Sequence, residues 1–239
     1  MTGKRLLCII PARSGSKCIP DKNIRLFKEH PLMCWSIIQM KKSRFINQTR
    51  IVVSTDSEKY QEIAKQYGAE TPFLRPAEIS GDHSTDLEFM KHCLQWFQDN
   101  EPDYNPDVIV QLRPTQPMRK VDDLDKTIQL FLDNYDNYDS LRTVVPLEKS
   151  PFKMYTLNDE NTVLQPLFKE VNGLQEPYNQ CRQVLPQAYL HNGYIDILKV
   201  ELVFQDKLSG ERIYPYVMSP EDTIDIDTEE DWKRGELSK

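Results

Sequence analysis

The sequence lacks any long hydrophobic run. The longest apolar stretch near the N-terminus, residues 6–10, is far shorter than the roughly 18 residues that a membrane helix needs, and it ends at Pro11, too early for a secretory signal. We therefore expect a cytoplasmic protein that begins near Met1 and has no membrane partner.

The sequence also lacks closely spaced cysteine pairs. The five cysteines are odd in number and form no C-x-x-C, which argues against a disulfide framework and a structural zinc site and favours reduced thiols.

Several common catalytic motifs are also absent. The eight glycines form neither G-x-G-x-x-G nor G-x-x-x-x-G-K-[ST], so the chain lacks the phosphate turns of dinucleotide oxidoreductases and P-loop enzymes. There is no G-x-S-x-G, no H-E-x-x-H and no kinase signature set, which excludes the commonest hydrolase, metalloprotease and kinase classes. The four histidines are scattered along the chain and are expected to be structural or surface residues.

The composition is that of an ordinary globular protein. With 239 residues, 39% hydrophobic and 28% charged, residues 1–239 are expected to form a single domain. The net charge of −7 argues against nucleic-acid binding, which needs a basic face. The charge is unevenly placed, however. Residues 1–30 carry seven basic and two acidic groups, and such a local cationic segment suits a small polyanion such as a nucleoside triphosphate. The alternative interpretation is a solvated charged loop.

Strand and helix patterns alternate in the first part of the chain. Continuous apolar runs predict buried strands at 5–10, 51–53, 108–112 and 141–145. Helical spacing predicts helices at 31–42, 60–67, 85–100 and 121–134, with possible capping boxes at Thr55 with Glu58 and at Thr85 with Glu88. This rhythm predicts an α/β fold, an open doubly wound and mostly parallel sheet of Rossmann-like type with helices on both faces.

The rhythm changes after Pro146. Strand-like segments at 152–157, 188–198 and 213–218 are separated by long polar connections, and we interpret about 148–190 as an inserted, β-rich dimerisation arm. Such a small two-stranded arm cannot bury its own faces, so it is expected to pack on a second subunit in a homodimer. Residues 223–227 then return to strand character, and Thr228 with Asp231 is expected to start a last helix.

A small-residue, cationic loop follows the first predicted strand. It runs from Pro11 to Asn23, at the sheet edge where ligands of open α/β sheets bind. Small residues let backbone N–H groups approach phosphate oxygens, while Arg13, Lys17 and Lys22 neutralise a triphosphate and the leaving pyrophosphate. The loop therefore predicts a triphosphate site.

A second feature lies near the C-terminus. Asp225 and Asp227 flank Ile226 at the predicted end of a strand, and strand alternation places both carboxylates on one face, spaced to share Mg²⁺. Such acidic pairs are common and weak as a signal when taken alone. Together with the cationic loop they predict metal-assisted nucleotidyl transfer.

Seven short blocks follow one another along nearly the whole chain. The blocks are residues 10–17 (IPARSGSK) with Pro20, Lys22 and Asn23, 53–56 (VSTD), 74–78 (LRPAE), 111–115 (QLRPT) with Pro117 and Arg119, 182–183 (RQ) with 185–187 (LPQ), 192–193 (NG) and 225–227 (DID). In this order they resemble the blocks of the sugar-acid cytidylyltransferases typified by CMP-N-acylneuraminate (CMP-sialic acid) synthetase. The resemblance implies a GT-A-like nucleotidyltransferase fold. It also implies activation of a 2-keto-3-deoxy sugar acid, an N-acylneuraminate or related nonulosonate or octulosonate, by CTP to give a CMP-sugar and pyrophosphate.

The resemblance also implies roles for individual residues. The catalytic set would be Arg13, Lys17, Lys22, Asp225 and Asp227, with Mg²⁺ held by the last two. Nucleotide-binding residues would be Ala12, Arg13, Ser14, Gly15, Ser16, Lys17, Lys22, Asn23, Arg75, Ser84 and Thr85. Sugar-binding residues would be Gln111, Lys153, Arg182, Gln183, Asn192 and Tyr194, with Lys153 inserted into the partner subunit's site. Asp56 is interpreted as a helix-capping residue and Arg75 as a loop clamp or a nucleotide contact.

Four positions depart from the family pattern. Ser14 and Cys18 stand where many relatives have glycine, and a side chain at Cys18 restricts a turn that requires positive φ. Leu190 replaces a common arginine and Asp196 a common tyrosine, which suggests a different sugar acid, one that bears an amino group. Alternative functions are a related nucleotidyltransferase using another base or sugar, a nucleotide-binding subunit without turnover, and a glycosyltransferase with an Asp-x-Asp metal pair.

Overall fold

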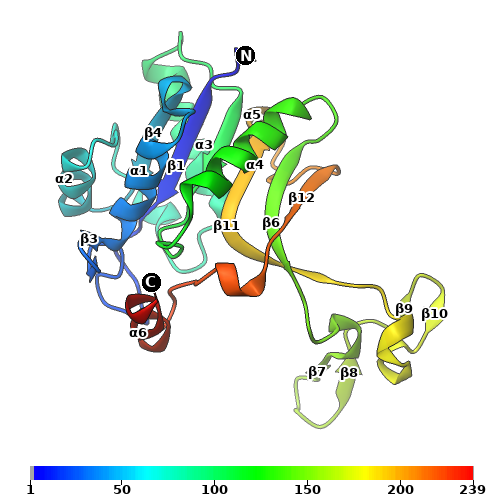
Figure 1. Cartoon of the computed structure of the whole chain (residues 1–239). Helices are drawn as coiled ribbons and strands as arrows, with labels where there is room; N and C mark the ends of the chain where they lie inside the picture. The colour runs from blue at the N-terminus through cyan, green and yellow to red at the C-terminus, as the bar shows by residue number, and fades with distance from the viewer. Residues whose placement is uncertain (1–2, 239) are drawn as a thin grey trace.

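The computed structural model describes residues 3–238, which form a six-stranded sheet covered by helices on both faces. The order across the sheet is β12-β6-β11-β5-β1-β4 (Figure 1). Only β11 runs antiparallel to its neighbours in this sheet; the other five strands run in one direction. The predicted open, mostly parallel α/β sheet is therefore confirmed. The sheet strands are β1 (Leu6–Pro11), β4 (Thr49–Ser54), β5 (Val108–Gln111), β6 (Ser140–Pro146), β11 (Tyr189–Lys199) and β12 (Ile213–Val217).

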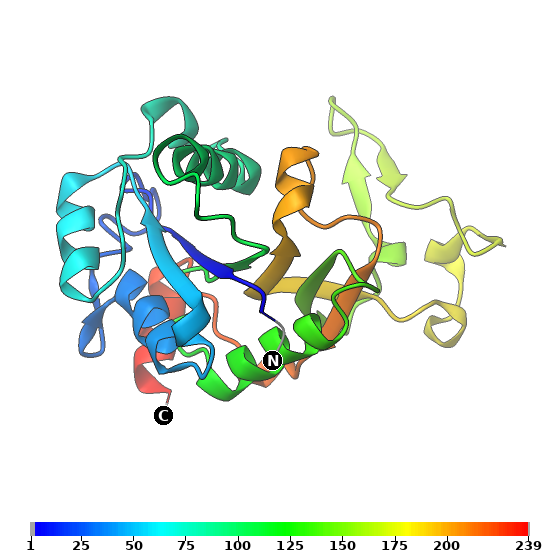
Figure 2. The ribbon, with the colours of Figure 1, turned by 90° about the horizontal axis from the view of Figure 1, so that it is seen from above.

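The apolar alternation of β1 places a core on each face of the sheet. Cys8 and Ile10 belong to a core cluster with residues of α1, α2 and α4, whereas Leu7 and Ile9 belong to a second cluster with residues of α3 and α5. Figure 2 shows α3 and α4 on opposite sides of the sheet. The helices are α1 (Leu32–Lys42), α2 (Glu58–Gln66), α3 (Asp86–Asn100), α4 (Val121–Asp133), α5 (Val200–Phe204) and α6 (Glu229–Leu237). Burial on both faces explains why β1 reads as a continuous apolar run.

The helix starts follow the predicted caps in two of three cases. Thr85 and Glu88 form a reciprocal capping box at α3, and Thr228 forms one at α6. The predicted box at Thr55 is wrong, because Ser57 caps α2 and accepts a hydrogen bond from Tyr60 N–H. No helix within residues 3–238 has both the length and the hydropathy needed to cross a bilayer.

The segment after β12 is held by side-chain packing and not by strand pairing. The predicted strand over 223–227 is wrong, because these residues belong to no strand. A backbone hydrogen bond joins them to the loop after β5, from Ile226 N–H to the Thr115 carbonyl oxygen at 2.8 Å. Ile226 is wholly buried in a small cluster with Ile19, Phe27 and Trp232 of α6. This cluster brings the C-terminal segment against the loop that follows β1.

Residues between β6 and β11 project away from the sheet (Figure 1). They contain two hairpins, β7–β8 and β9–β10, and short 3₁₀ turns. The predicted strand over 152–157 begins only at Tyr155, because Pro151–Lys153 forms a 3₁₀ turn. The hairpin strands are β7 (Tyr155–Leu157), β8 (Leu164–Pro166), β9 (Glu170–Val171) and β10 (Leu174–Gln175); a further small pair, β2 (Leu26–Phe27) and β3 (His30–Pro31), precedes α1. Large apolar side chains are exposed on this projecting segment: Met154, Tyr155, Leu157, Val163, Leu164, Leu167 and Phe168.

Candidate active site

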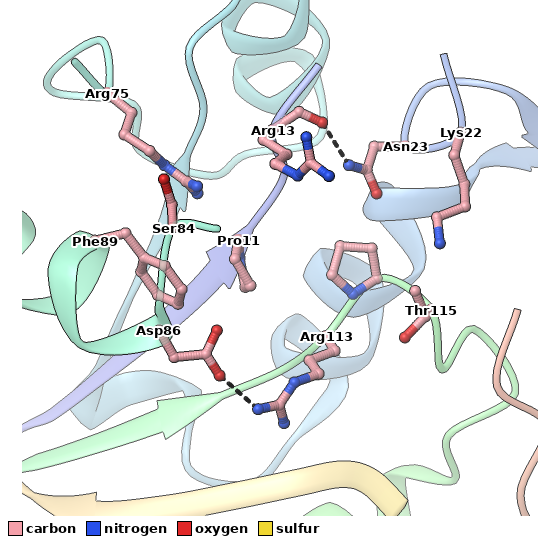
Figure 3. Close-up of a pocket in the computed structure, with 11 residues that line it drawn as sticks. Pro11, Arg13, Lys22, Asn23, Arg75, Ser84, Asp86, Phe89, Arg113 and Thr115 are labelled. Atoms are coloured by element: carbon pink, nitrogen blue, oxygen red, sulfur yellow. Dashed lines mark hydrogen bonds and ion pairs between the residues drawn. The ribbon is translucent and has the colours of Figure 1, made fainter. Parts of the chain in front are cut away.

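A pocket of about 230 Å³ opens near the carboxyl ends of β1, β4 and β5. It is lined by Pro11, Arg13, Lys22, Asn23, Arg75, Ser84, Asp86, Phe89, Arg113, Pro114 and Thr115 (Figure 3). The sequence-predicted Arg13, Lys22, Asn23, Arg75 and Ser84 therefore share one cavity. Ligands bind at this edge of open α/β sheets because parallel strands end there and their following loops diverge.

The loop after β1 is fixed by its neighbours. Ala12 is buried and its N–H donates to the Ser54 carbonyl oxygen of β4 at 2.9 Å, which extends the parallel pairing by one residue. Ser14 donates twice to the Asp56 carboxylate, from its N–H and from its Oγ, at 2.8 Å each. Asn23 Nδ2 donates to the Arg13 carbonyl oxygen at 2.9 Å. Asp56 thus holds the loop; it does not cap α2 as predicted.

Two of the predicted phosphate-binding cations share one carboxylate. Arg13 Nη2 lies 2.9 Å from Asp82 Oδ1, and Lys17 Nζ pairs with Asp82 Oδ2. Arg13 also donates to the Gly15 carbonyl oxygen at 2.7 Å. The pairing with Lys17 and Arg13 holds the pKa of Asp82 below its ordinary value. Asp82 is a residue that sequence reasoning missed, because nothing in the sequence pattern distinguishes it from other loop carboxylates.

The third loop cation lies against the predicted metal pair. Lys22 Nζ donates to the Ile226 carbonyl oxygen and to Asp227 Oδ1, each at 3.0 Å, and 14% of its side chain is exposed. Partial desolvation raises the pKa of Asp225, and the neighbouring Asp227 charge adds to this. The structure therefore brings together the cationic loop and the Asp225–Asp227 pair, which are about 200 residues apart in the sequence.

The carboxylate pair fits a divalent cation. A cationic group, the Lys22 ammonium, already lies against Asp227, and carboxylate oxygens are the ligands that Mg²⁺ prefers. Within residues 3–238 no three histidine, cysteine, aspartate or glutamate side chains are grouped to hold a metal.

Arg75 and Phe89 form another wall of the pocket. Arg75 is buried, donates from Nε to Ser54 Oγ at 3.0 Å and lies over the Phe89 ring at 4.9 Å. Desolvation by burial lowers the pKa of Arg75 to about 10. Thr85 is occupied as the cap of α3 and does not line this cavity, whereas the preceding Ser84 does.

Arg113, not Gln111, lines the pocket from β5. Gln111 is 2% exposed and its Nε2 donates to Asp86 at 2.9 Å, so its predicted contact with the sugar is not available in this conformation. Arg113 lies beyond the end of β5, where its guanidinium pairs with Asp86 at 2.6 Å and with Asp196 (Figure 3 shows the first pair). The sequence signal that could have indicated Arg113 is its place in the QLRPT block, after the last strand residue.

The other predicted sugar residues are divided between the sheet and the projecting segment. Tyr194 is wholly buried, its hydroxyl accepts from Lys120 N–H at 2.6 Å, and it does not line the pocket beside β1. Asn192 uses Oδ1 to accept from Thr143 Oγ1 at 2.7 Å. The projecting segment carries the other three, Lys153, Arg182 and Gln183. Lys153 and Arg182 line a separate cavity of about 370 Å³ with Glu148, Lys149, Ser150 and Met154.

The departures from the family pattern are accommodated locally. Cys18 is exposed and is not among the residues with positive φ, so its side chain adds no backbone strain. Asp196 has only 7% of its side chain exposed. Its carboxylate pairs with the Arg113 guanidinium, and its Oδ1 lies 2.7 Å from His191 Nε2. The carboxylate is buried in these contacts, which contradicts the hypothesis that Asp196 recognises an amino group of the sugar. Gly15, Ser16 and Lys17 lie in the loop next to this pocket but do not line it.

Comparison with solved structures shows the same fold elsewhere. A CMP:2-keto-3-deoxy-manno-octonic acid synthetase complexed with CTP superposes with a TM-score of 0.68 at 13% identity, covering 98% of this chain and 97% of the other. A 4-diphosphocytidyl-2C-methyl-D-erythritol synthase from Anaerococcus prevotii superposes with a TM-score of 0.62 at 12% identity, covering 98% and 97%.

Sequence relatives are more similar. An N-acylneuraminate cytidylyltransferase of Streptococcus agalactiae is 32% identical over 95% of this chain, but the chain spans only about half (51%) of that relative's length. Post-translational flagellin modification protein B of Campylobacter coli is 31% identical, covering 95% of this chain and 92% of the relative. A CMP-N,N'-diacetyllegionaminic acid synthase of Legionella pneumophila is also 31% identical, covering 95% and 93%.

A family model described as cytidylyltransferase matches residues 7–181. This match includes the β1 loop, Arg75 and the QLRPT block, and it ends before the Asp225–Asp227 pair. Together with the relatives it confirms the resemblance drawn from the sequence blocks, and the chain belongs to the cytidylyltransferase family.

Proposed function

We propose that this protein transfers the cytidylyl group of CTP to a 2-keto-3-deoxy sugar acid of the nonulosonate class, giving a CMP-sugar and pyrophosphate. The observation that carries the proposal is the contact of Lys22 with Asp227, since it joins the cationic loop, through a residue that lines the pocket, to the carboxylate pair beside it. Nucleotidyl transfer needs both features, cations for the phosphates and carboxylates that would hold a metal. The relatives named above as N-acylneuraminate and legionaminic acid enzymes support this class of substrate.

Residues that line the pocket and residues beside it both have a part in this proposal. Arg13 and Lys22, which line the pocket, and Lys17, in the loop next to it, bind the phosphates, with help from the small-residue backbone of 14–16. Arg75 and Ser84 bind the nucleoside. Asp225 and Asp227 hold Mg²⁺, which when bound polarises the phosphate oxygens and supports ionisation of the attacking hydroxyl. Arg113, at the far wall, contacts the sugar acid.

The chemistry proposed is an in-line displacement. The C2 hydroxyl oxygen of the sugar acid forms a bond to the α-phosphorus of CTP, the bond from that phosphorus to the bridging oxygen breaks, and pyrophosphate leaves with that oxygen. The hydroxyl proton passes to water. Lys22 and Arg13 stabilise the charge that develops on the phosphates, because ammonium and guanidinium groups next to phosphoryl oxygens act most strongly in a partly desolvated cavity.

We also propose that the projecting segment makes a homodimer. Its exposed apolar side chains need cover, and Lys153 and Arg182 line a cationic cavity of their own that is separate from the pocket by β1. Lys153 would enter the partner's site next to the substrate carboxylate. The reaction is placed in the cytoplasm, where CTP is available.

A subunit-mixing experiment tests the homodimer. Lys153→Ala and Arg13→Ala each lower activity, and mixed dimers regain part of it because one of the two sites is then intact. Sedimentation gives the oligomeric state independently. A monomer, or mixed samples with no more activity than the two variants measured separately, contradicts a trans-acting Lys153.

A nucleotide panel tests the base. Calorimetric titration with CTP, UTP, ATP and GTP in the presence of Mg²⁺ is expected to give the tightest binding for CTP. Tighter binding of another nucleotide would favour a related nucleotidyltransferase instead. Binding of CTP without turnover on any sugar acid would favour a nucleotide-binding subunit.

A further inference from the structure

The Asp82 carboxylate forms ion pairs with Arg13 and Lys17, two loop cations that the proposed function assigns to phosphate. One of its carboxylate oxygens lies 2.9 Å from Arg13 Nη2, and the other pairs with Lys17 Nζ. Its side chain is 32% exposed, and Lys17 is 76% exposed. Two cations on one carboxylate reproduce the pattern by which two cations hold adjacent oxygens of a phosphate.

The position of Asp82 allows it to be displaced. It lies in the segment between the 3₁₀ turn Ala77–Ile79 and α3, two residues before Ser84, which lines the nucleotide pocket. Neither oxygen of Asp82 contacts a backbone N–H, so only the ion pairs with Arg13 and Lys17 hold it over the loop in the described part of the chain. Exposed ion pairs of this kind are weak, and a polyphosphate carries more charge than one carboxylate.

We propose that Asp82 is an internal counter-anion of the phosphate loop, which nucleotide triphosphate must displace and which re-forms its pairs as pyrophosphate leaves. This inference rests on the proposed function, since it assigns Arg13 and Lys17 to phosphate. Asp82 thereby lowers the affinity of the loop for phosphate ligands in general and keeps Arg13 and Lys17 ordered when no nucleotide is bound. It sets the affinity for nucleotide and product without touching the reacting atoms.

Asp82→Asn tests this directly, because asparagine keeps the shape and removes the charge. Calorimetric titration with CTP and with inorganic tripolyphosphate is expected to show about fivefold tighter binding of both to the variant, the size expected for two exposed pairs. Inhibition by pyrophosphate is expected to strengthen by a similar factor. Glu78→Gln is the matched control: it removes the same charge from a nearby exposed residue that forms no ion pair within residues 3–238, and binding is expected to stay as in the wild type.

A second variant tests the contact itself. In a Lys17→Met background the Asp82→Asn change is expected to tighten tripolyphosphate binding by less than in the wild-type background, because one of the two pairs is already gone. Thermal unfolding of each variant shows whether the fold is intact.

The outcomes separate this inference from the proposed function. Wild-type protein that binds CTP, together with an Asp82→Asn variant that binds CTP and tripolyphosphate equally or more weakly, overturns the counter-anion role alone. An equal gain in Glu78→Gln overturns it as well, since the effect would then be one of general charge. Wild-type protein that binds no nucleoside triphosphate overturns the proposed function and this inference with it.

Discussion

The Asp56 carboxylate at the end of β4 accepts two hydrogen bonds from Ser14, one from its N–H and one from its Oγ, both 2.8 Å long. Asp56 therefore orders the loop after β1 from the neighbouring parallel strand. Because Ser14 lies between Arg13 and the small residues of the loop, this contact fixes the part of the chain to which phosphate binding is assigned. Asp56 does not line the pocket and acts through Ser14, so its role is one of positioning.

Removal of this carboxylate should weaken nucleotide binding. For Asp56→Ala we expect the KM for CTP to rise about tenfold, since two hydrogen bonds to a charged acceptor are lost, with a smaller change in kcat. Asp56→Asn, which still accepts one bond, should lie between the wild type and Asp56→Ala. Steady-state kinetics at varied CTP measures both values, and Asp99→Asn, at an exposed carboxylate of α3, serves as the control. An unchanged KM in Asp56→Ala would show that the loop orders itself without this contact.

The carboxylate pair should be essential for turnover but not for folding. Asp227→Ala is expected to lower kcat by at least about a hundredfold, because a metal ligand acts on the charge that develops in the transition state. Asp227 is exposed, with 64% of its side chain accessible, so the melting temperature should change little. The measurement is activity over a Mg²⁺ titration beside thermal unfolding. Near-normal rates at saturating Mg²⁺ would show that the pair is structural.

Arg119 should be a stability residue beneath the pocket. Its guanidinium is buried, its pKa is lowered to about 10 by desolvation, and it donates to Gln39 Oε1 at 2.6 Å and to the carbonyl oxygens of Tyr194 and Arg113 at 2.6 and 3.0 Å. For Arg119→Met we expect the free energy of unfolding to fall by about 3 kcal/mol, because buried acceptors lose their donors. Urea unfolding measures this. A loss below about 1 kcal/mol would mean that water replaces the guanidinium easily.

Asp196 should contribute to the pH dependence of stability. Burial alone would raise its pKa, but the hydrogen bond with His191 and the Arg113 charge outweigh burial and lower it below the ordinary value of 3.8. A carboxyl whose pKa is lower in the folded state stabilises the fold above its unfolded pKa, and this contribution is lost as the pH falls toward its folded pKa. Asp196→Asn is therefore expected to cost about 3 kcal/mol at pH 7 and to make stability less dependent on pH below about 4.

Urea unfolding of wild type and Asp196→Asn between about pH 2 and pH 7 measures this difference. The two curves should keep a constant separation above about pH 4 and approach each other below it. A separation that stays constant down to the lowest pH would contradict an ionised, stabilising Asp196.

Local patterns predicted most of the sheet, because β1, β4, β5 and β6 are apolar runs bounded by clear breaks. They also predicted the start of α3, which carries a complete capping box. Position within the sheet was harder to infer. The antiparallel direction of β11 depends on the long connection before it, and the segment at 223–227 has strand-like composition but is held by the burial of Ile226.

The site was predictable where one loop carries it. Arg13, Lys22 and Asn23 follow directly from their place after β1, and all three line the pocket. Contacts made by side chains from other segments left no signal in the sequence. Asp82 and Asp86 are ordinary polar residues near the start of α3, and only the fold shows that one faces Arg13 and the other Arg113. The burial of Tyr194 left no signal either, because an aromatic residue beside a predicted sugar residue has the same pattern whether it is buried or exposed.

Pyrophosphate release shows whether CTP and a sugar acid react at this pocket. The purified protein is incubated with CTP and Mg²⁺ and, in separate reactions, with N-acetylneuraminate, legionaminate-type, pseudaminate-type and octulosonate acids. We predict pyrophosphate release that depends on one of these acids, on CTP and on Mg²⁺, with a CMP-sugar formed in equal amount. Release that is independent of the acid, or no release with any acid from a protein that binds CTP, would show that the protein does not transfer a cytidylyl group to these sugar acids.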